Sequence, residues 1–222
     1  MVLTLKIYVV IPVKSLKNVK SRLSTILSRE ARHRLTFKML LDVLQTVKQV
    51  KNIWEILVVS SDKKILNFAK DLGVETLQEE KDSGVNSAIS CALNHLQYDE
   101  NSALLILPSD IPLITPRDVN VAINLGLEKQ SITISPSLRF DGTNLLLLNP
   151  PKVIPTFYED DSFHKHVAEA FKRNVKVKLY VSWRIMLDVD ETEDLKMLTT
   201  IDEETFTSRF VSKKFKEIGL KL

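Results

Sequence analysis

The sequence predicts an α/β fold, in which a mainly parallel β-sheet carries helices on both faces. Two observations predict it. Short apolar runs rich in β-branched residues recur along the chain, and such runs are typical of strands buried on both faces. Longer segments with helical periodicity lie between them, and this alternation is typical of parallel sheets. The 222 residues, 44% of them hydrophobic, suit one domain over 1–222 with a core at about 3–199.

The predicted strands are apolar runs at 5–13, 54–61, 103–110 and 131–137. The first run, LKIYVVIPV, raises the question of a signal peptide. However, Lys6 interrupts it and no small-residue cleavage site follows, so a first strand is the better interpretation. No stretch approaches the roughly 20 apolar residues that span a bilayer. We therefore expect a cytoplasmic protein that does not enter a membrane.

Helical patterns follow these strands. Ser28 is suited to cap a first helix and Asp62 a second. The remaining elements are helices at 86–97, 116–129, 162–174 and 191–199, an alternating strand at 175–182, and an amphipathic helix at 202–217. This last helix carries Phe206, Phe210 and Phe215, which could pack on the same domain or form a contact in a homodimer.

Composition excludes several classes of protein. Net charge is only +3, with 31 basic and 28 acidic side chains, so the chain as a whole gives no reason to expect a nucleic-acid partner. Cys91 is the one cysteine, which excludes a disulfide framework and a cysteine zinc cluster. His164 and His166 stand two apart on a predicted helix and do not share a face, so we expect structural roles for them.

A cluster of basic residues follows the first strand. Lys14, Lys17, Lys20 and Arg22 lie within nine residues, at the sheet edge where open α/β folds bind ligands. The chain has five glycines, and none forms a GxGxxG or Walker loop. Phosphates would therefore have to be bound by side-chain cations. The alternative interpretation is an ordinary solvated basic loop.

Acidic residues reach the same edge. The strand at 103–107 ends in LPSDIP, which brings Asp110 there with Ser109 beside it. In LDVDETEDL, Asp188 and Asp190 alternate along an extended segment and could hold one divalent cation. Asp110 and Asp190 together would suffice for Mg²⁺ shared with a nucleotide. The alternatives are a helix or turn cap for Asp110 and a helix N-cap for Asp190, and for Asp188 the N-cap is the favoured interpretation.

Two polar turns complete the candidates. In GVNSA, the amide of Asn86 can read a base or a ribose hydroxyl, or Asn86 can cap the helix that follows. In RFDGTNLLLL, Gly142 turns the chain and Thr143 and Asn144 precede a new strand. A simple hairpin turn is the alternative interpretation of that segment.

Seven motifs occur in the order seen in 2-phospho-L-lactate guanylyltransferases, the enzymes of coenzyme F420 biosynthesis that this chain resembles. They are VIPVKSLKNVKSRLS, VVSSD, GVNSA, LPSDIPLITPRDV, FDGTNLLLLNPP, SFHKHVAEA and LDVDETEDL. Each is weak alone, but seven in order are specific. The resemblance covers roughly 6–198 and leaves the segment from 202 onward unexplained. It implies a Rossmann-like fold of the nucleotide-diphospho-sugar-transferase type, similar to that of molybdenum-cofactor guanylyltransferases.

The resemblance also implies an activity. GTP would be the donor, and 2-phospho-L-lactate, phosphoenolpyruvate or 3-phosphoglycerate the acceptor, with pyrophosphate released. The implied roles are Mg²⁺ binding by Asp110 and Asp190, acceptor binding by Thr143 and Ser162, contacts of Lys14, Lys20 and Arg22 with the triphosphate, and a nucleotide-binding region that includes Asn86 and Ser109.

The chain departs from the family pattern at two places. A glycine-rich turn commonly precedes the serine, whereas here Glu159, Asp160 and Asp161 do, and three carboxylates would repel an anionic acceptor unless a metal intervenes. Thr192 replaces a proline, which should loosen the start of the following helix. Two rival functions stay open: a metal-dependent nucleotide-sugar glycosyltransferase, because DVD also fits the metal motif of that class, and a non-catalytic nucleic-acid binder.

Overall fold

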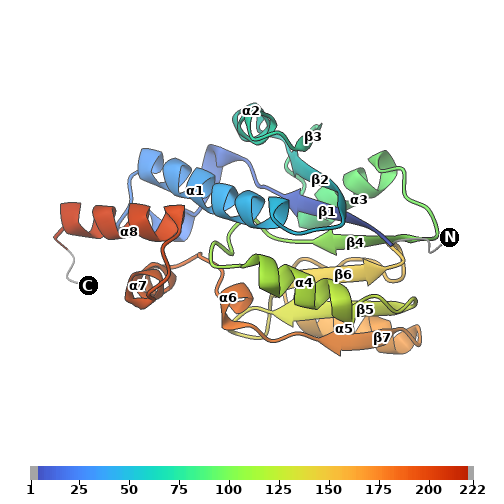
Figure 1. The fold of residues 1–222 in the computed structure, drawn as a ribbon. Helices are drawn as coiled ribbons and strands as arrows, with labels where there is room; N and C mark the ends of the chain where they lie inside the picture. Colours follow the sequence, from blue (N-terminus) through green and yellow to red (C-terminus); the bar gives the residue numbers. More distant parts are fainter. Residues whose placement is uncertain (1–4, 220–222) are drawn as a thin grey trace.

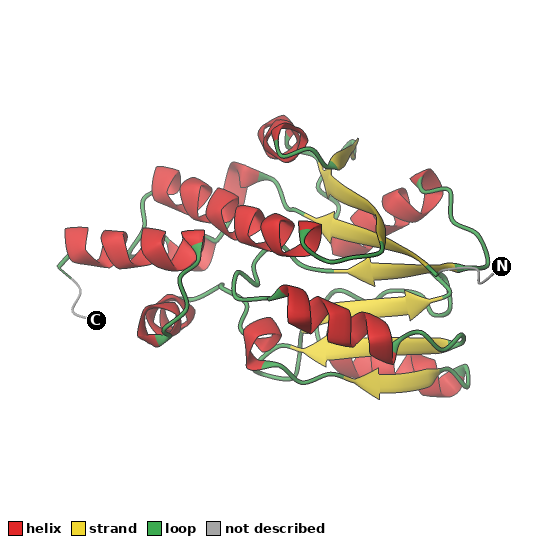
Figure 2. Cartoon of the chain, viewed as in Figure 1, coloured by secondary structure: helices red, strands yellow, loops and turns green. Residues whose placement is uncertain are grey.

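A seven-stranded sheet forms the centre of the computed structural model, which describes residues 5–219 (Figures 1 and 2). Its strands stand in the order β3-β2-β1-β4-β6-β5-β7. In chain order they are β1 (Lys6–Pro12), β2 (Ile53–Ser60), β3 (Glu75–Gln78), β4 (Ser102–Ile106), β5 (Ser131–Pro136), β6 (Thr143–Asn149) and β7 (Lys176–Leu179). Each predicted strand is present, and β3 is an additional one.

The sheet is mainly parallel, as predicted, with one reversed strand. β1 pairs in parallel with both β2 and β4, β2 with β3, and β5 with β7. β6 runs antiparallel to β4 and β5. The reversal comes from a hairpin in which Ser137 N–H donates to the carbonyl of Gly142 at 2.9 Å. The hairpin interpretation is therefore confirmed, and Thr143 and Asn144 are the first residues of β6 rather than residues before it.

Helices cover both faces of the sheet, because side chains along each strand alternate between two hydrophobic clusters. On one face, Val9, Val58 and Leu105 pack against α1 (Arg29–Lys48), α2 (Lys63–Asp71) and α4 (Pro116–Leu125). On the other, Val10, Leu57 and Ile106 pack against α3 (Val85–His95) and α5 (Ser162–Lys172). In Figure 1, α1 and α4 accordingly lie in front of the sheet and α3 and α5 behind it.

Most of the predicted helix starts are confirmed. The Ser28 side chain accepts from Ala31 N–H at the start of α1, and Asp62 accepts from Lys64 N–H at the start of α2. For α3 the cap prediction is wrong: Gly84, with φ of 92°, is the capping residue, and Asn86 lies inside the first turn. A glycine suits this place because L side chains rarely adopt a positive φ.

The C-terminal helices pack on the start of α1. α7 (Thr192–Thr200) and α8 (Phe206–Glu217) enclose a third apolar cluster that includes Leu35, Met39 and the fully buried Phe215. The Asp42 carboxylate of α1 accepts from the backbone N–H groups of Phe206 at 2.8 Å and Thr207 at 2.9 Å. The amphipathic segment thus packs on its own chain, the first of the two alternatives.

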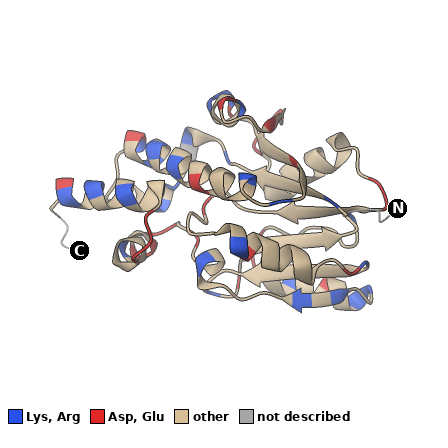
Figure 3. Ribbon diagram, in the orientation of Figure 1, with Lys and Arg blue, Asp and Glu red and all other residues tan. Residues whose placement is uncertain are grey.

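No helix within the described part of the chain is long and apolar enough to cross a membrane. Lys and Arg occur on many elements, including α1, β7 and α8 (Figure 3). The segment after β1 is therefore one of several segments that carry basic residues. Its significance depends on the residues that the fold places beside it.

Candidate active site

A cleft of about 860 Å³ opens where β1 and β4 end. This is the carboxyl edge of the parallel strands, the expected place for a ligand. Seven residues singled out from the sequence line it together: Lys14, Lys17, Lys20, Arg22, Ser109, Asp110 and Asp190. Asp190 lies far along the chain, and the fold brings it to the edge that β1 and β4 share.

The basic segment is held in place by carboxylates from neighbouring elements. Ser15 N–H donates to Asp82 at 2.8 Å, and Leu16 N–H donates to Asp62 at 3.1 Å. Two short 3₁₀ turns, Leu16–Asn18 and Ser21–Leu23, then carry the chain along the cleft. Between them Lys20 takes a left-handed conformation with φ of 50°, which is uncommon for a residue with a Cβ atom and often marks a functional site.

The Lys20 ammonium bridges the two predicted metal ligands. Its Nζ lies 2.7 Å from Asp110 Oδ2 and 2.6 Å from Asp190 Oδ1, and its side chain is only 8% exposed. Burial lowers the pKa of Lys20, but the charges of Asp110 and Asp190 outweigh it and hold that pKa above the ordinary value. Burial also raises the pKa of Asp190, and Lys20 more than reverses this. In this cluster one buried ammonium thus faces two carboxyl groups.

The helix-cap interpretations of Asp110, Asp188 and Asp190 are wrong, because other residues cap the helices. Thr115 caps α4 in a capping box with Asp118. Glu191 caps α7 in a capping box with Asp194, whose carboxylate also accepts from Asp190 N–H at 2.8 Å. This capping box starts α7 at Thr192 without the proline.

Asp188 has a different environment from Asp190. Its Oδ1 accepts from Asn144 Nδ2 at 3.0 Å, a contact that the sequence did not suggest. Burial, with the nearby charge of Asp110, raises the pKa of Asp188 to about 6. The two aspartates that share one cationic partner are Asp110 and Asp190, and Asp188 lies behind them, held by Asn144.

A second cavity of about 350 Å³ adjoins the cleft, and Arg22 and Asp190 line both. Its other basic residue is Arg139, which contacts Glu191 Oε2 at 2.7 Å, while Arg22 contacts Glu191 Oε1 at 3.1 Å. Its carboxylates come from Asp141, Glu159, Asp160, Asp161, Asp188, Asp190 and Asp194. The second cavity is thus strongly acidic, with two arginines at its rim.

One residue of the acidic turn has a backbone conformation that favours glycine. Asp161 precedes α5 with φ of 57°, the left-handed conformation that favours glycine. Its carboxylate pairs with the exposed ring of His164 at 2.6 Å. At Asp161, a position whose backbone conformation favours glycine therefore carries a carboxylate.

Thr143 and Ser162, predicted to bind the acceptor, lie against each other beneath the second cavity. Their hydroxyl oxygens are 3.0 Å apart, and both residues are buried, next to the lining residues Gly142 and Asp161. Behind them is the fully buried His166, whose Nδ1 lies 3.1 Å from Thr143 Oγ1. From the sequence we expect only a structural role for His166, although helical spacing places it on one face with Ser162.

Asn86 does not line the cleft, although its neighbour Val85 does. Asn86 instead holds a loop in place. Its Oδ1 accepts from Tyr158 N–H at 2.8 Å, and Tyr158 lines the cleft. Asn86 therefore contacts the cleft only through Tyr158, and its role in nucleotide binding stays a prediction.

The residues fit a small divalent cation shared with a ligand. Among residues 5–219, no three His, Cys, Asp or Glu side chains are grouped so that they could hold a metal ion by themselves. Asp110 and Asp190 nevertheless both contact Lys20 Nζ. Their oxygens can therefore both contact a single cation placed near the position of that nitrogen. Mg²⁺ is commonly bound by one or two carboxylates, with substrate phosphates and water as further ligands.

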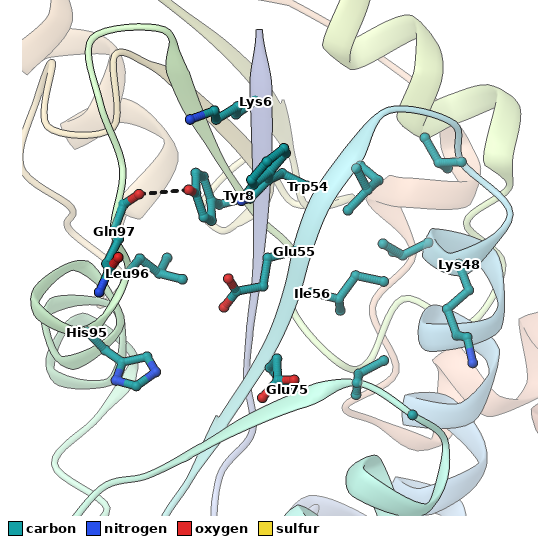
Figure 4. A pocket seen from close by; sticks show the side chains of 15 residues that line it. Lys6, Tyr8, Lys48, Trp54, Glu55, Ile56, Glu75, His95, Leu96 and Gln97 are labelled. Carbon is teal, nitrogen blue, oxygen red and sulfur yellow. Dashed lines mark hydrogen bonds between the residues drawn. The ribbon is translucent and has the colours of Figure 1, made fainter. Parts of the chain in front are cut away.

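Another cavity, of about 910 Å³, lies at the opposite ends of β1 and β2 (Figure 4). Its lining includes Lys6, Tyr8, Trp54, Glu55 and Glu75, and none of the residues singled out above. Since ligands of open α/β sheets bind at the carboxyl ends of the strands, we assign the site to the cleft that contains Lys20.

Comparison with known proteins agrees with the family resemblance seen in the sequence motifs. A family model described as "Guanylyl transferase CofC like" matches residues 7–220. The chain is 36% identical to the 2-phospho-L-lactate guanylyltransferase of Methanocaldococcus jannaschii over 93% of its own length and 88% of that protein. It is 35% identical to the phosphoenolpyruvate guanylyltransferase of Rubrobacter xylanophilus over 87% of its length and 94% of that protein.

Solved structures share the fold at low sequence identity. A protein of Desulfovibrio desulfuricans G20 described as a nucleotide-diphospho-sugar transferase superposes with a TM-score of 0.74 at 18% identity, over 96% of both chains. A CMP:2-keto-3-deoxy-manno-octonic acid synthetase gives 0.60 at 12% identity, over 88% of this chain and 97% of that one. The predicted nucleotide-diphospho-sugar-transferase type of fold is confirmed.

Proposed function

This chain belongs to the guanylyl transferase family typified by CofC, and we propose that it transfers GMP from GTP to a small phosphorylated three-carbon acid. The acid would be 2-phospho-L-lactate, phosphoenolpyruvate or 3-phosphoglycerate, and the reaction would serve coenzyme F420 biosynthesis. Two of these acids occur in the names of relatives of similar identity, 36% and 35%, so similarity alone does not choose between them.

One observation carries the proposal: the two cavities meet at Arg22 and Asp190. A triphosphate in the larger cleft would lie against Lys14, Lys20 and Arg22. An acid in the smaller cavity would then approach it from the side of Arg139. The meeting point is also where Asp110 and Asp190 converge on Lys20. Two anionic substrates would thus come together where the chain gathers its charged groups.

The bonds exchanged are simple. An oxygen of the acid's phosphate attacks the α-phosphorus of GTP, and the bond from that phosphorus to the oxygen bridging to the β-phosphate breaks. Pyrophosphate leaves with the electron pair. The second pKa of a phosphate monoester is near 6, so the attacking group is already ionised at pH 7 and needs no general base. The task of the protein is to position the groups and to stabilise charge.

Asp110 and Asp190 would hold Mg²⁺, and Lys20 would then turn from these carboxylates to the phosphates. Bound there, Mg²⁺ would neutralise negative charge on the phosphate oxygens of the donor and the acceptor. Arg22 and Lys14 face the same region, and both contribute positive potential at Asp190. Arg22 is suited to bidentate contact with a phosphate.

Thr143 and Ser162 are proposed to bind the acceptor from beneath the second cavity. The acidic turn, Glu159 to Asp161, would repel a free phospho-acid. We therefore expect acceptor binding to depend on Mg²⁺ as well. Cytoplasmic location and homodimer formation stay predictions, and size-exclusion chromatography with light scattering would test the second.

The glycosyltransferase alternative has no better support, because the neighbour described as a sugar transferase is only 18% identical and shows the fold alone. An assay separates the two reactions. Protein is incubated with GTP, Mg²⁺ and each of the three acids, and both pyrophosphate and GDP are measured. Pyrophosphate release that requires an acid is expected. In a parallel reaction with a GDP-sugar as donor and a sugar as acceptor, release of GDP, with no pyrophosphate from GTP, would favour the glycosyltransferase.

A further inference from the structure

A buried hydrogen-bonded chain runs from the loop before α5 to the acceptor side of the site. Phe157 N–H donates to His166 Nε2 at 2.8 Å, His166 Nδ1 lies 3.1 Å from Thr143 Oγ1, and Thr143 Oγ1 lies 3.0 Å from Ser162 Oγ. The imidazole is fully buried, with the rings of Phe157 and Tyr158 packed around it. Its position and its hydrogen bonds are therefore both fixed.

The backbone determines which nitrogen of His166 carries hydrogen. A backbone N–H can only donate, so Nε2 must accept from Phe157 and carries no hydrogen. Nδ1 then carries the hydrogen of the neutral ring and faces Thr143 Oγ1 at 3.1 Å, which therefore cannot donate to the ring. The Ser162 backbone also accepts from the ring. Burial lowers the pKa of His166 to about 4, so the ring is neutral at physiological pH.

This tautomer decides how many hydrogens the hydroxyl pair can offer. Nδ1–H and the two hydroxyls supply three hydrogens, and the two short contacts use two of them, whichever hydroxyl donates to the other. One hydroxyl hydrogen remains. With Ser162 donating to Thr143, the remaining hydrogen is that of Thr143. With the opposite direction it is that of Ser162, whose Oγ lies 3.5 Å from the carbonyl of Asp141, which is long for a hydroxyl hydrogen bond. With the opposite tautomer Thr143 would have to donate to Nδ1, and no hydrogen would remain.

We propose that His166 is a positioning residue for the acceptor, which acts through Thr143 and Ser162 and leaves one of their hydroxyls as a donor toward an anionic oxygen of the phospho-acid. The proposal rests on the proposed function of the site. Thr143 and Ser162 directly follow Gly142 and Asp161, two residues that line the second cavity. His166 itself touches neither substrate.

Two substitutions test the roles of the two ring nitrogen atoms, Nδ1 and Nε2, separately. His166→Asn keeps an N–H near the place of Nδ1 and loses the acceptor for Phe157. His166→Gln keeps an acceptor near the place of Nε2 and loses the donor to Thr143. KM for the acid and KM for GTP are measured for both variants, with the exposed His95→Gln as the control. Thermal unfolding shows whether each variant is folded.

We expect KM for the acid to rise about tenfold or more in His166→Gln and about threefold or less in His166→Asn, with KM for GTP unchanged in both. Equal rises in the two variants, or a rise in KM for GTP to match, would mean that the ring only supports packing. Thr143→Val should remove most of the difference between the two variants, because the effect passes through this hydroxyl.

A measurement on the wild-type protein tests the proposal without turnover. Nitrogen NMR of histidine-labelled protein identifies which ring nitrogen of His166 carries the hydrogen, with His166→Asn providing the assignment. Hydrogen on Nδ1 is expected, and hydrogen on Nε2 would overturn the inference whatever the activity. Absence of pyrophosphate release by the wild type would instead overturn the proposed function, so the two failures are distinguishable.

Discussion

Lys20 and Asp190 are 170 residues apart in the sequence, and Lys20 Nζ lies 2.6 Å from Asp190 Oδ1. The contact closes a cluster in which one buried ammonium joins the end of β4, through Asp110, to the segment before α7. A backbone hydrogen bond of 2.9 Å from Val189 N–H to the carbonyl of Asp110 holds the same two segments together. The two carboxylates are thus fixed close to each other before any ligand binds.

Asp110→Asn should reduce kcat/KM for the acid by about 100-fold or more, because the amide has no charge with which to hold Mg²⁺ near the phosphates. Pyrophosphate release is the measurement. Asp71→Asn, at an exposed position at the end of α2, is the matched control and should match the wild type. A folded Asp110→Asn protein with nearly full activity would refute the metal role of Asp110.

Lys20→Met should destabilise the protein without metal by about 1–3 kcal/mol, because Asp110 and Asp190 then face each other without a cation. Mg²⁺ should raise the unfolding temperature more in this variant than in the wild type, since the ammonium no longer competes for the carboxylates. Thermal unfolding with and without Mg²⁺ measures both effects, with the exposed Lys70→Met as the control. Equal shifts in the variant and the wild type would speak against a shared site.

His166 should make stability depend on pH. Burial lowers its pKa to about 4, whereas the unfolded chain protonates near the ordinary value of about 6.5. As pH falls from 6.5 toward 4, the unfolded state gains a proton that the folded state does not, so stability is lost in that window and is fully present above it. The contribution is about 3 kcal/mol at most.

His166→Asn lacks this titration. Urea unfolding between pH 4.5 and 7.5 should therefore show the stability difference between wild type and variant shrinking as pH falls. A difference that stays constant across the range would show that the ring is accessible to protons in the folded protein.

Asp42→Ala should cost about 2 kcal/mol of stability, because the carboxylate accepts from the Phe206 and Thr207 backbone N–H groups and from Thr207 Oγ1 at 2.6 Å. KM for GTP should not change, since Asp42 does not line the cleft. Urea unfolding and steady-state kinetics measure the two quantities. Unchanged stability would mean that α8 is held by its apolar side chains alone.

The sequence predicts the sheet well where strands are buried on both faces, because such strands read as continuous apolar runs. β3 was missed because it is a four-residue edge strand, ETLQ, with exposed ends and no apolar run. Helix capping was predicted where a single side chain could do it, at Ser28 and Asp62. It failed before α7, where the sequence offers several acids and only the fold selects Glu191 and Asp194.

For the site, the rule that ligands bind at the carboxyl ends of strands places Lys20 and Asp110 at one edge. The direct contact between them depends on the left-handed turn at Lys20, which no residue pattern specifies. For His166 the sequence argues against a zinc pair with His164 and predicts a structural role. Its spacing from Ser162 and Ala170, four residues each way, was the signal that these three share the buried face of α5.

The most direct test of the central claim follows the fate of the α-phosphate. GTP labelled at the α-phosphorus is incubated with the protein, Mg²⁺ and each phospho-acid. The products are then separated and identified by mass spectrometry. The account predicts that label and guanosine appear joined to one acid through a diphosphate, with equimolar pyrophosphate, and that Asp110→Asn forms no such product. Label that remains in GTP with every acid, in protein shown to be folded and to bind GTP, would contradict it.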